Sequence, residues 1–397
     1  MTDVLRIFDD AQIRDPYPRY AQWRERHPIW FDAQSGHWVL SRHDDVMNVL
    51  KDHQRFSSSA MGGLGTQLPP ITDDPPRHTQ LRSIVNKAFT TAMLKSMEGD
   101  VCAIANDLVG ALPRDRDVDI VQALTTPLPV TVIARMMGIP EERKEDFKRW
   151  SDALTGTLAG ATQQARQSEI MEMAAFFRGL IPERRARPAG DLVSAVVNAE
   201  VDGKGLSEWE IVGFCVLLLI AGNETTTNLL GNLLNVLADR PALWQRLRTD
   251  PALIEPAIEE LLRYDSPVQF LMRAATTEVT LHSKTIAAGD RVIVVMGSAN
   301  RDASQFDAPD EFRLDRTRGR HLAFGYGVHF CIGAPLARLE ARVAMTALLG
   351  RAATIERGAG AAQRVPSHLL RGFEHLSLRL HHSPAARVVA ASNEGRP

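Results

Sequence analysis

The sequence predicts a mainly α-helical protein with a small β region. Apolar residues recur with the helical period over most of the 397 residues. The stretch 207–237 is long and apolar enough to form one buried helix of about 45 Å, at a rise of about 1.5 Å per residue. Runs rich in β-branched and aromatic residues, which are typical of strands, are short and few. They cover 37–42, 278–282, 291–296 and 376–380.

The N-terminal part of the chain mixes both element types. Residues 16–26 have the spacing of a short amphipathic helix, and the strand at 37–42 is followed by a helix at 43–52. Residues 57–76 contain too many Gly and Pro for regular structure, and a loop of this length is often functional. A helix resumes at 77–89.

The rest of the chain predicts a succession of helices. Ser207 and Glu210 have the spacing of a capping box at the start of the longest one, and the Gly-Ile-Pro triplet at 138–140 marks a helix stop. We expect a single domain over 1–383, with a small β-rich N-terminal subregion, and a flexible tail at 384–397. The other expected helices cover 94–111, 118–138, 141–157, 163–187, 190–199, 251–264 and the segment just past Cys331.

Composition and charge exclude several function classes. A hydrophobic fraction of 44% and a charged fraction of 24% are ordinary for a globular protein. A formal net charge of −2 gives no reason to expect binding to nucleic acid or to a membrane surface. The most apolar run, 211–222, is shorter than the roughly 20 residues that cross a bilayer, and the acidic N-terminus is unlike a signal peptide. We therefore expect a cytoplasmic protein.

Cysteine usage draws attention to one loop. Cys102, Cys215 and Cys331 lack the spacing of zinc ribbons, disulfide frameworks or covalent haem of the c type. Cys331 lies in the glycine-rich stretch FGYGVHFCIGAP, residues 324–335. A lone cysteine is more often a small buried hydrophobic residue than a ligand.

The surroundings of Cys331 nevertheless favour a ligand. A thiolate is a strong soft ligand, and haem iron is one of its partners. Gly325, Gly327 and Gly333 would let the backbone pass close to a flat macrocycle, and Phe324 could shield the sulfur. The helix that begins just past the cysteine supplies positive potential for the thiolate at its N-terminus.

Together with His329, these residues form the pattern F-G-x-G-x-H-x-C-x-G, which closely resembles the haem-ligand loop of the cytochromes P-450. A second match is the tetrad in EELLR, where Glu260 and Arg263 share one helix face. The tetrad alone would more often be a solvated surface pair, but the family has a buried structural pair at this place. Arg316, in the segment PDEFRLDR, is the expected third partner.

The stretch AGNETTT, 221–227, is a third match. Thr can bond back to a carbonyl one turn earlier and distort a helix, and Gly222 weakens the helix at the same point. Ala221, Gly222, Glu224 and Thr225 fit the family's Ala/Gly-Gly-x-Asp/Glu-Thr motif, with Glu where many members have Asp. The resemblance implies that Glu224 relays protons and that Thr225 hydrogen-bonds dioxygen or its proton-donating water. The alternative is a helix interior that bends for packing.

Residues elsewhere match the family's contacts to haem. His78 and Arg82 are four apart on a predicted helix, and two donors on one face suit a carboxylate. In the family this pair holds a haem propionate, and Arg273 and His329 match two further propionate contacts. The resemblance also assigns haem contacts to Phe324, Gly325, Gly333 and Ala221.

The resemblance covers nearly the whole chain, from DPYPRY to LSLRL. It implies a triangular-prism helical domain with haem b between the long central helix and the cysteine-loop helix, and Cys331 as the iron ligand. The implied activity is a monooxygenase reaction, hydroxylation included, that inserts one atom of O₂ into an apolar small molecule. Electrons from NAD(P)H would arrive through a ferredoxin, of the [2Fe-2S] or another type, and its reductase, as in soluble bacterial class I members.

Partner and substrate are the least determined features. We expect a monomer, and Arg338 and Arg342 are either contacts for the ferredoxin or ordinary solvated charges. A terpenoid, steroid, fatty acid or polyketide-like substrate is favoured because the residues that correspond to the family's pocket walls are mostly aliphatic, although Arg371 could anchor a carboxylate. These residues, each equally consistent with a core position, are Leu64, Leu68, Leu217, Val268, Phe270, Leu271 and Leu369.

Three other functions stay open. A peroxygenase driven by H₂O₂ and a haem-binding sensor without turnover would both share the cysteine loop. Neither of them needs the pair Glu224–Thr225, so the pair argues against both. A helical scaffold with a buried, unligated cysteine would be colourless.

Overall fold

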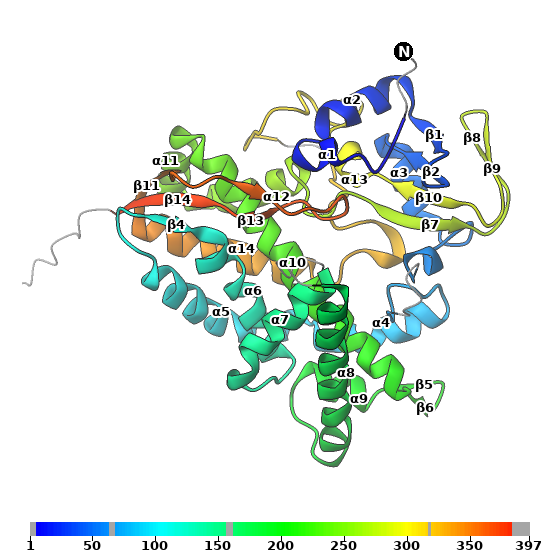
Figure 1. Cartoon of the computed structure of the whole chain (residues 1–397), viewed down its shortest axis with the longest axis horizontal. Coiled ribbons are helices and arrows are strands. Elements are labelled where there is room, and N and C mark those ends of the chain that lie inside the picture. Colours follow the sequence, from blue (N-terminus) through cyan, green and yellow to red (C-terminus); the bar gives the residue numbers. More distant parts are fainter. Residues whose placement is uncertain (1–4, 63–67, 156–161, 317–318, 383–397) are drawn as a thin grey trace, which may run out of the picture.

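The structure is a computed structural model that describes residues 5–62, 68–155, 162–316 and 319–382. Helices fill most of the molecule, and the largest sheet lies with the N-terminal helices on one side of it (Figure 1). The predicted class, mainly α with a small β region, is confirmed. The expected tail at 384–397 lies outside the described residues.

The helices follow one another along most of the chain, with the sheets between and around them (Figure 1). Their bounds are α1 (Asp10–Arg14), α2 (Tyr17–Arg26), α3 (His43–Lys51), α4 (Arg77–Ala88), α5 (Thr91–Ala111), α6 (Pro127–Met136), α7 (Lys144–Thr155), α8 (Gln163–Ala186), α9 (Leu192–Val197), α10 (Glu208–Ala238), α11 (Pro241–Thr249), α12 (Ile254–Tyr264), α13 (Met296–Ala299) and α14 (Ala334–Arg351).

The strands form one larger sheet and several small ones. The larger sheet has the order β1-β2-β10-β7-β3 and a second one the order β11-β14-β4, while β12-β13, β5-β6 and β8-β9 are two-stranded. The bounds are β1 (Ile29–Asp32), β2 (His37–Leu40), β3 (Phe56–Ser57), β4 (Asp117–Asp119), β5 (Glu200–Val201), β6 (Lys204–Gly205), β7 (Leu271–Ala275), β8 (Val279–Leu281), β9 (Lys284–Ile286), β10 (Arg291–Val294), β11 (Ala352–Arg357), β12 (Gln363–Arg364), β13 (Phe373–His375) and β14 (Ser377–His382).

The larger sheet separates two hydrophobic clusters. Successive side chains of a strand point to opposite faces, and on β10 Val292 and Val294 join one cluster while Ile293 joins the other. The second cluster contains Tyr17, Tyr20 and other residues of the N-terminal segment. This sheet therefore holds the N-terminal helices on one face and β7, which leads towards the site, in its interior.

The long helix α10 is the centre of the helical part. Ser207 caps it, and the predicted capping box with Glu210 is present in both directions. Helix α10 packs against α6, α7, α8, α12 and α14. By length and composition it could cross a membrane, but 67% of its most apolar window is buried inside the protein, as expected of a core helix.

The structure corrects some of the predicted elements. The helix expected at 118–138 consists of strand β4, a π-helical turn at Val121–Thr125 and the shorter helix α6. Pro127 has no backbone N–H to donate, so it can stand only in the first turn of a helix, and α6 begins there. The helix expected at 190–199 is limited to α9, while α11, β1 and β7 were not predicted.

A buried ion cluster holds the segment that precedes the cysteine loop. On α12 the Arg263 guanidinium donates to both carboxylate oxygens of Glu260, at 2.7 and 2.9 Å. Arg316 donates to the same two oxygens at 3.2 and 3.1 Å. Glu260 is 4% exposed and Arg263 2% exposed. The remaining N–H groups of the two arginines donate to the carbonyls of Asn300, Asp307, Ala308, Pro309 and Glu311.

We expect Glu260→Ala to lower the free energy of unfolding by about 3–5 kcal/mol, because it leaves two buried guanidinium groups without their carboxylate. Urea unfolding followed by circular dichroism measures this loss. The matched control is Glu278→Ala, which removes an exposed carboxylate from a loop and should change the value little. A loss under about 1 kcal/mol for Glu260→Ala, the size found for surface pairs, would contradict the structural role.

Candidate active site

The cysteine loop begins at Phe324, includes the 3-10 turn Gly327–His329 and ends where helix α14 begins. Its N-terminal end is closed by the Cys331 N–H, which donates to the Phe324 carbonyl at 2.9 Å. Gly325 and Gly327 have φ angles of +69° and +71°, which side chains other than glycine rarely adopt. A Cβ on Gly327 would also stand 2.7 Å from the Leu50 carbonyl oxygen. This glycine is therefore needed for close packing against the end of α3.

Backbone N–H groups point at the Cys331 sulfur, as the position before a helix N-terminus requires. The residue is exposed at its surface, yet protein atoms surround it closely enough that burial raises the pKa of the thiol. Hydrogen bonds from the N–H groups of Gly333 and Ala334, together with the charges of Arg82 and Arg338, lower that pKa. The loop thus carries the groups that stabilise a thiolate.

Phe324 packs beside this loop rather than being free to turn. Its ring meets the Phe330 ring edge to face at 6.3 Å, and the Arg338 guanidinium lies 4.6 Å from its centre. Gly333, by contrast, has an ordinary helical conformation, and a Cβ there would be 3.8 Å from the Cys331 sulfur. The sulfur is accordingly bordered by backbone with no side chain at 333, while Phe324 packs between Phe330 and Arg338.

Four basic residues lie close together on the N-terminal side of the Cys331 sulfur: His78, Arg82, Arg273 and His329. His78 of α4 and His329 of the loop have ring centres 4.1 Å apart. Both His78 ring nitrogens and Nε2 of His329 are buried without a hydrogen-bond partner among the described residues. Arg273 of β7 is 3% exposed and donates to the Met272 carbonyl. Buried donors without acceptors are costly, which indicates a site that takes an anionic acceptor.

The electrostatics of these four residues fit the same conclusion. Burial, and then repulsion from Arg82, lowers the pKa of His78 to about 4. Burial, followed by His78, Arg273 and Arg82, lowers the pKa of His329 to about 3. Burial also lowers the pKa of Arg273 to about 10. The group therefore repels further positive charge, and a carboxylate bound among them would relieve that repulsion.

Arg82 has a second task that its motif did not reveal. Its guanidinium donates to the carbonyls of Val328 and Phe330, at 3.0 and 2.5 Å. Helix α4 is thereby attached to the residues that immediately precede Cys331. Since the two bonds use part of the five N–H groups of the guanidinium, Arg82 can brace the loop and still face an anion.

One stripe of the long helix stays partly exposed. Leu217, Ala221 and Thr225 are spaced at i, i+4 and i+8, so they share a face of α10. Most other residues of the helix are buried. The Thr225 hydroxyl donates to the Ala221 carbonyl at 2.8 Å, as predicted. The structure assigns α-helix to the whole of α10, so the distortion expected at this point does not break the helix.

Glu224 lies beside this stripe but is turned into the protein. It is 7% exposed. Burial, and secondarily the Asp152 carboxylate, raises the pKa of Glu224 to about 7, against the opposite effect of Lys148. The carboxyl is therefore about half protonated near neutral pH and can give or take a proton there.

One of the predicted pocket residues reaches the cysteine loop, and others lie close to it in the chain. Leu271 approaches Gly325, with its Cδ1 3.9 Å from the position of a Cβ there. Val268 is paired with Leu370 in an antiparallel bridge, and the Gln269 N–H donates to the Leu369 carbonyl at 2.8 Å. The segments 268–271 and 367–371 thus lie side by side. Leu68 is partly buried against the main core, and Leu64 lies outside the described residues.

Phe270 is a correction. The structure places it in the hydrophobic cluster of the N-terminal segment, where it is 6% exposed and packs beside Ile293. Along an extended segment its neighbour Leu271 points to the opposite face, so only one of the two can line a pocket near the cysteine. The interpretation of Phe270 as a pocket residue was wrong because the strand register was not known.

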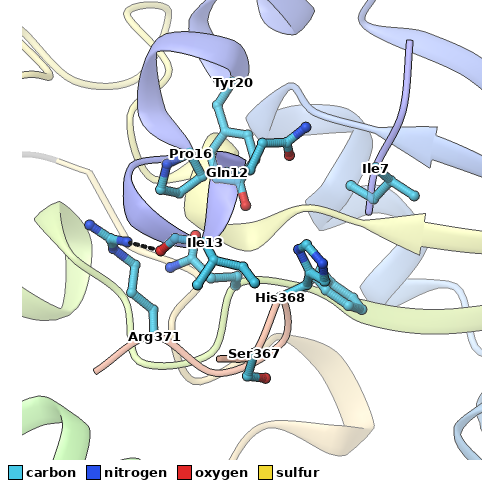
Figure 2. A pocket seen from close by; sticks show the side chains of 10 residues that line it. Ile7, Gln12, Ile13, Pro16, Tyr20, Ser367, His368 and Arg371 are labelled. Atoms are coloured by element: carbon cyan, nitrogen blue, oxygen red, sulfur yellow. Dashed lines mark hydrogen bonds between the residues drawn. The ribbon is translucent and has the colours of Figure 1, made fainter. Parts of the chain in front are cut away.

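Arg371 is a second correction. It is 8% exposed, and its guanidinium bonds Asp265 at 2.5 Å and the carbonyls of Ile13 and Arg14 at 3.3 Å. Figure 2 shows it beside a small pocket between α1, α2 and the turn that carries Ser367 and His368. That cavity measures about 20 Å³, space for about one water molecule. Arg371 is committed to a structural ion pair and cannot anchor a substrate carboxylate.

Arg338 and Arg342 are also less available than expected. Arg338 donates to both carboxylate oxygens of Glu259, at 2.6 and 2.9 Å. Arg342 donates to Glu98 at 2.6 Å. Their charges are balanced by partners on α12 and α5, which weakens the prediction that they attract an acidic protein.

The protein compares closely with known proteins of one kind. The family model described as "Cytochrome P450" matches residues 117–352. The chain belongs to the cytochrome P450 family. The "Putative cytochrome P450 YjiB" of Bacillus subtilis is 40% identical over 344 residues, which are 84% of this chain and 86% of the relative.

Solved cytochrome P450 structures share the fold over almost their whole length. CYP109E1 from Bacillus megaterium in complex with testosterone has a TM-score of 0.84 and 40% identity, covering 92% of this chain and 99% of the other. CYP109Q5 from Chondromyces apiculatus has a TM-score of 0.88 and 38% identity, covering 96% and 99%. The protein is therefore a cytochrome P450 monooxygenase that uses haem b and electrons derived from NAD(P)H.

The residues present fit haem b. Cys331 offers a soft sulfur with N–H groups directed at it, which suits haem iron. The buried histidine nitrogens without partners and the adjacent arginines offer donors to two propionate groups. His329 and Cys331 are two residues apart, so the loop itself supplies one of these donors beside the sulfur.

We expect Cys331→Ser to abolish the long-wavelength absorption band of the reduced carbon monoxide complex, because an alcohol cannot replace a thiolate on the iron. The difference spectrum of the reduced protein with and without carbon monoxide measures this band. Cys102→Ser, a change at a partly buried cysteine on α5, is the control and should keep it. A Cys331→Ser protein with an unchanged band would show that another residue is the ligand.

Proposed function

We propose that this cytochrome P450 hydroxylates apolar molecules of steroid size, with Cys331 as iron ligand and Glu224 and Thr225 as its proton-delivery pair. The observation that carries the proposal is the pair on α10. A buried carboxyl with a pKa of about 7 directly precedes a threonine on the partly exposed stripe of the helix. A sensor or a peroxygenase has no need for such a pair.

The bound haem would supply the activation of O₂, and the chain would supply binding, orientation and protons. His78, Arg82, Arg273 and His329 would hold the propionates. The N–H groups of Gly333 and Ala334 would keep electron density on the Cys331 sulfur by stabilising its negative charge.

Thr225 would position the proton. Its hydroxyl donates to the Ala221 carbonyl at 2.8 Å, which leaves its oxygen as an acceptor for a water molecule. Glu224 is buried and about half protonated near pH 7, so it can pass a proton to such a water and recover it from solvent. In this proposal the Glu224 carboxyl supplies the proton, and the Thr225 hydroxyl orients the water that carries it.

The substrate proposal rests on the lining. Leu217 and Ala221 on α10, with Val268 and Leu271 before Arg273, present aliphatic side chains and no charge. A pocket with such a lining favours an apolar ligand, which is bound through buried apolar surface rather than through ion pairs. The related CYP109E1 binds testosterone in its crystal structure, and we extend that ligand class to this protein.

The electron donor is proposed from the family resemblance alone. A ferredoxin with its reductase would deliver two electrons singly, on the side of the cysteine loop. Since Arg338 and Arg342 are paired with glutamates, the docking contacts must include other residues of that face. We propose a monomeric cytoplasmic enzyme for the same reason of resemblance.

We expect Thr225→Ala to divert most of the reducing equivalents from product to hydrogen peroxide, because the proton is no longer oriented. Product, peroxide and NAD(P)H consumption measured together give the coupling. Thr225→Ser retains the hydroxyl and should keep most of it, while the carbon monoxide band should be normal in both variants. Tight coupling in Thr225→Ala would remove this residue from the mechanism, and faster turnover with peroxide alone would indicate a peroxygenase.

We expect testosterone to shift the Soret band of the ferric protein on binding, and Leu217→Ala to raise its Kd about tenfold. Removing the leucine side chain loses about 1.5 kcal/mol or more of binding free energy from buried apolar area. A loss of about 1.4 kcal/mol corresponds to a tenfold change in affinity. Spectral titration measures the Kd. Trp209→Ala, at an exposed position in the first turn of α10, is the control and should leave it unchanged. The absence of a shift with testosterone and corticosterone would contradict the steroid proposal.

A further inference from the structure

Helices α7 and α10 are joined at the level of Glu224. Asn223 on α10 donates from its side-chain amide to the Ser151 hydroxyl on α7 at 2.7 Å, and both residues are fully buried. Glu224 follows Asn223, and Asp152 follows Ser151. The hydrogen bond therefore joins the two packed helices at the residues that directly precede the two acidic ones.

Asp152 is half of an ion pair that lies nearer to solvent. The Lys148 ammonium contacts the Asp152 carboxylate at 2.7 Å, with the two residues one helical turn apart. Their side chains are 39% and 18% exposed, against 7% for Glu224. The pair is thus more exposed to solvent than the Glu224 carboxyl.

The far side of α7 is fixed independently. Arg149 bonds Asp146 on its own helix at 2.7 Å, and Glu169 and Glu172 on α8 at 2.6 and about 3.0 Å. Because α8 holds α7 through Arg149 and α10 holds it through Ser151, the distance of Asp152 from Glu224 has little freedom to vary. A fixed distance is what an electrostatic effect on a neighbouring carboxyl requires.

We propose that the Lys148–Asp152 ion pair sets the protonation state of Glu224 and thereby the pH range in which the enzyme couples oxygen use to product. Asp152 and Lys148 would be positioning residues that act through Glu224. The inference rests on the proposed role of Glu224 as proton donor.

The two charges of the pair act in opposite directions. Among the described residues they are the charged groups that act on the Glu224 carboxyl, in addition to burial. A negative charge nearby disfavours a second carboxylate and keeps Glu224 protonated, and a positive charge favours its ionised form. Glu224 donates a proton only below its pKa, so coupling should fail as the pH rises past that value.

Asp152→Asn and Lys148→Met should therefore shift the pH dependence of coupling in opposite directions. Asp152→Asn removes the negative charge and leaves the lysine acting alone, so the alkaline limb should move to lower pH, by roughly one unit. Lys148→Met leaves Asp152 acting alone, so the limb should move to higher pH, by less. Both are measured on the haem-loaded enzyme as product formed per NAD(P)H consumed.

A second readout does not depend on turnover. The infrared carbonyl band of the protonated Glu224 carboxyl, identified by its absence in Glu224→Gln, should titrate with the same shifted midpoints. Arg185→Met is the control, because it removes a positive charge at an exposed position of α8, and this charge is not one of those that act on Glu224. It should leave the midpoint in place.

The outcomes separate the role of the Lys148–Asp152 ion pair from the proposed role of Glu224 as proton donor. Unchanged midpoints in Asp152→Asn and Lys148→Met, shifts in one common direction, or an equal shift in Arg185→Met would overturn the role of the ion pair while leaving Glu224 as donor. Glu224→Gln with normal coupling at all pH values would instead overturn the proposed role of Glu224. Carbon monoxide spectra of all variants establish that the haem site itself is intact.

Discussion

The structure depends on one buried carboxylate. Glu260 accepts hydrogen bonds from Arg263 and Arg316, and the two guanidinium groups donate to five carbonyls of the connecting segment between Asn300 and Glu311. A backbone without regular structure can be held in the interior only if its carbonyls find donors. The two arginines provide those donors and Glu260 balances their charge, and the segment that they hold leads in sequence to the cysteine loop.

The second level of organisation is electrostatic. The loop gathers N–H groups and basic side chains around the sulfur and around the two histidines, and some of the buried nitrogens there have no acceptor among the described residues. On α10 a stripe of apolar side chains and the Thr225 hydroxyl stays partly exposed, next to the buried Glu224 carboxyl, whose pKa is near neutrality. Positive potential on one side and an apolar surface on the other suit a planar cofactor that carries two carboxylates at one edge and reacts at its centre.

Prediction from sequence succeeded where spacing within one element decides the geometry. The capping box of α10, the Thr225 bond to Ala221 and the shared face of Glu260 and Arg263 follow from the helical repeat alone. It failed where a partner elsewhere in the chain decides. Phe270 was misplaced because its orientation depends on the register of β7 with β10, and Arg371 because Asp265 is 106 residues away in sequence.

Short-range patterns in the sequence were enough to predict the fold class, the family, the cysteine loop and the residues that share one face of α10. The packed structure was needed to show that Arg82 braces the loop, that Arg338 and Arg342 are paired with glutamates, and that the charges of Asp152 and Lys148 act on Glu224. Charge and burial act through space, and the distances through which they act exist only once the helices have packed.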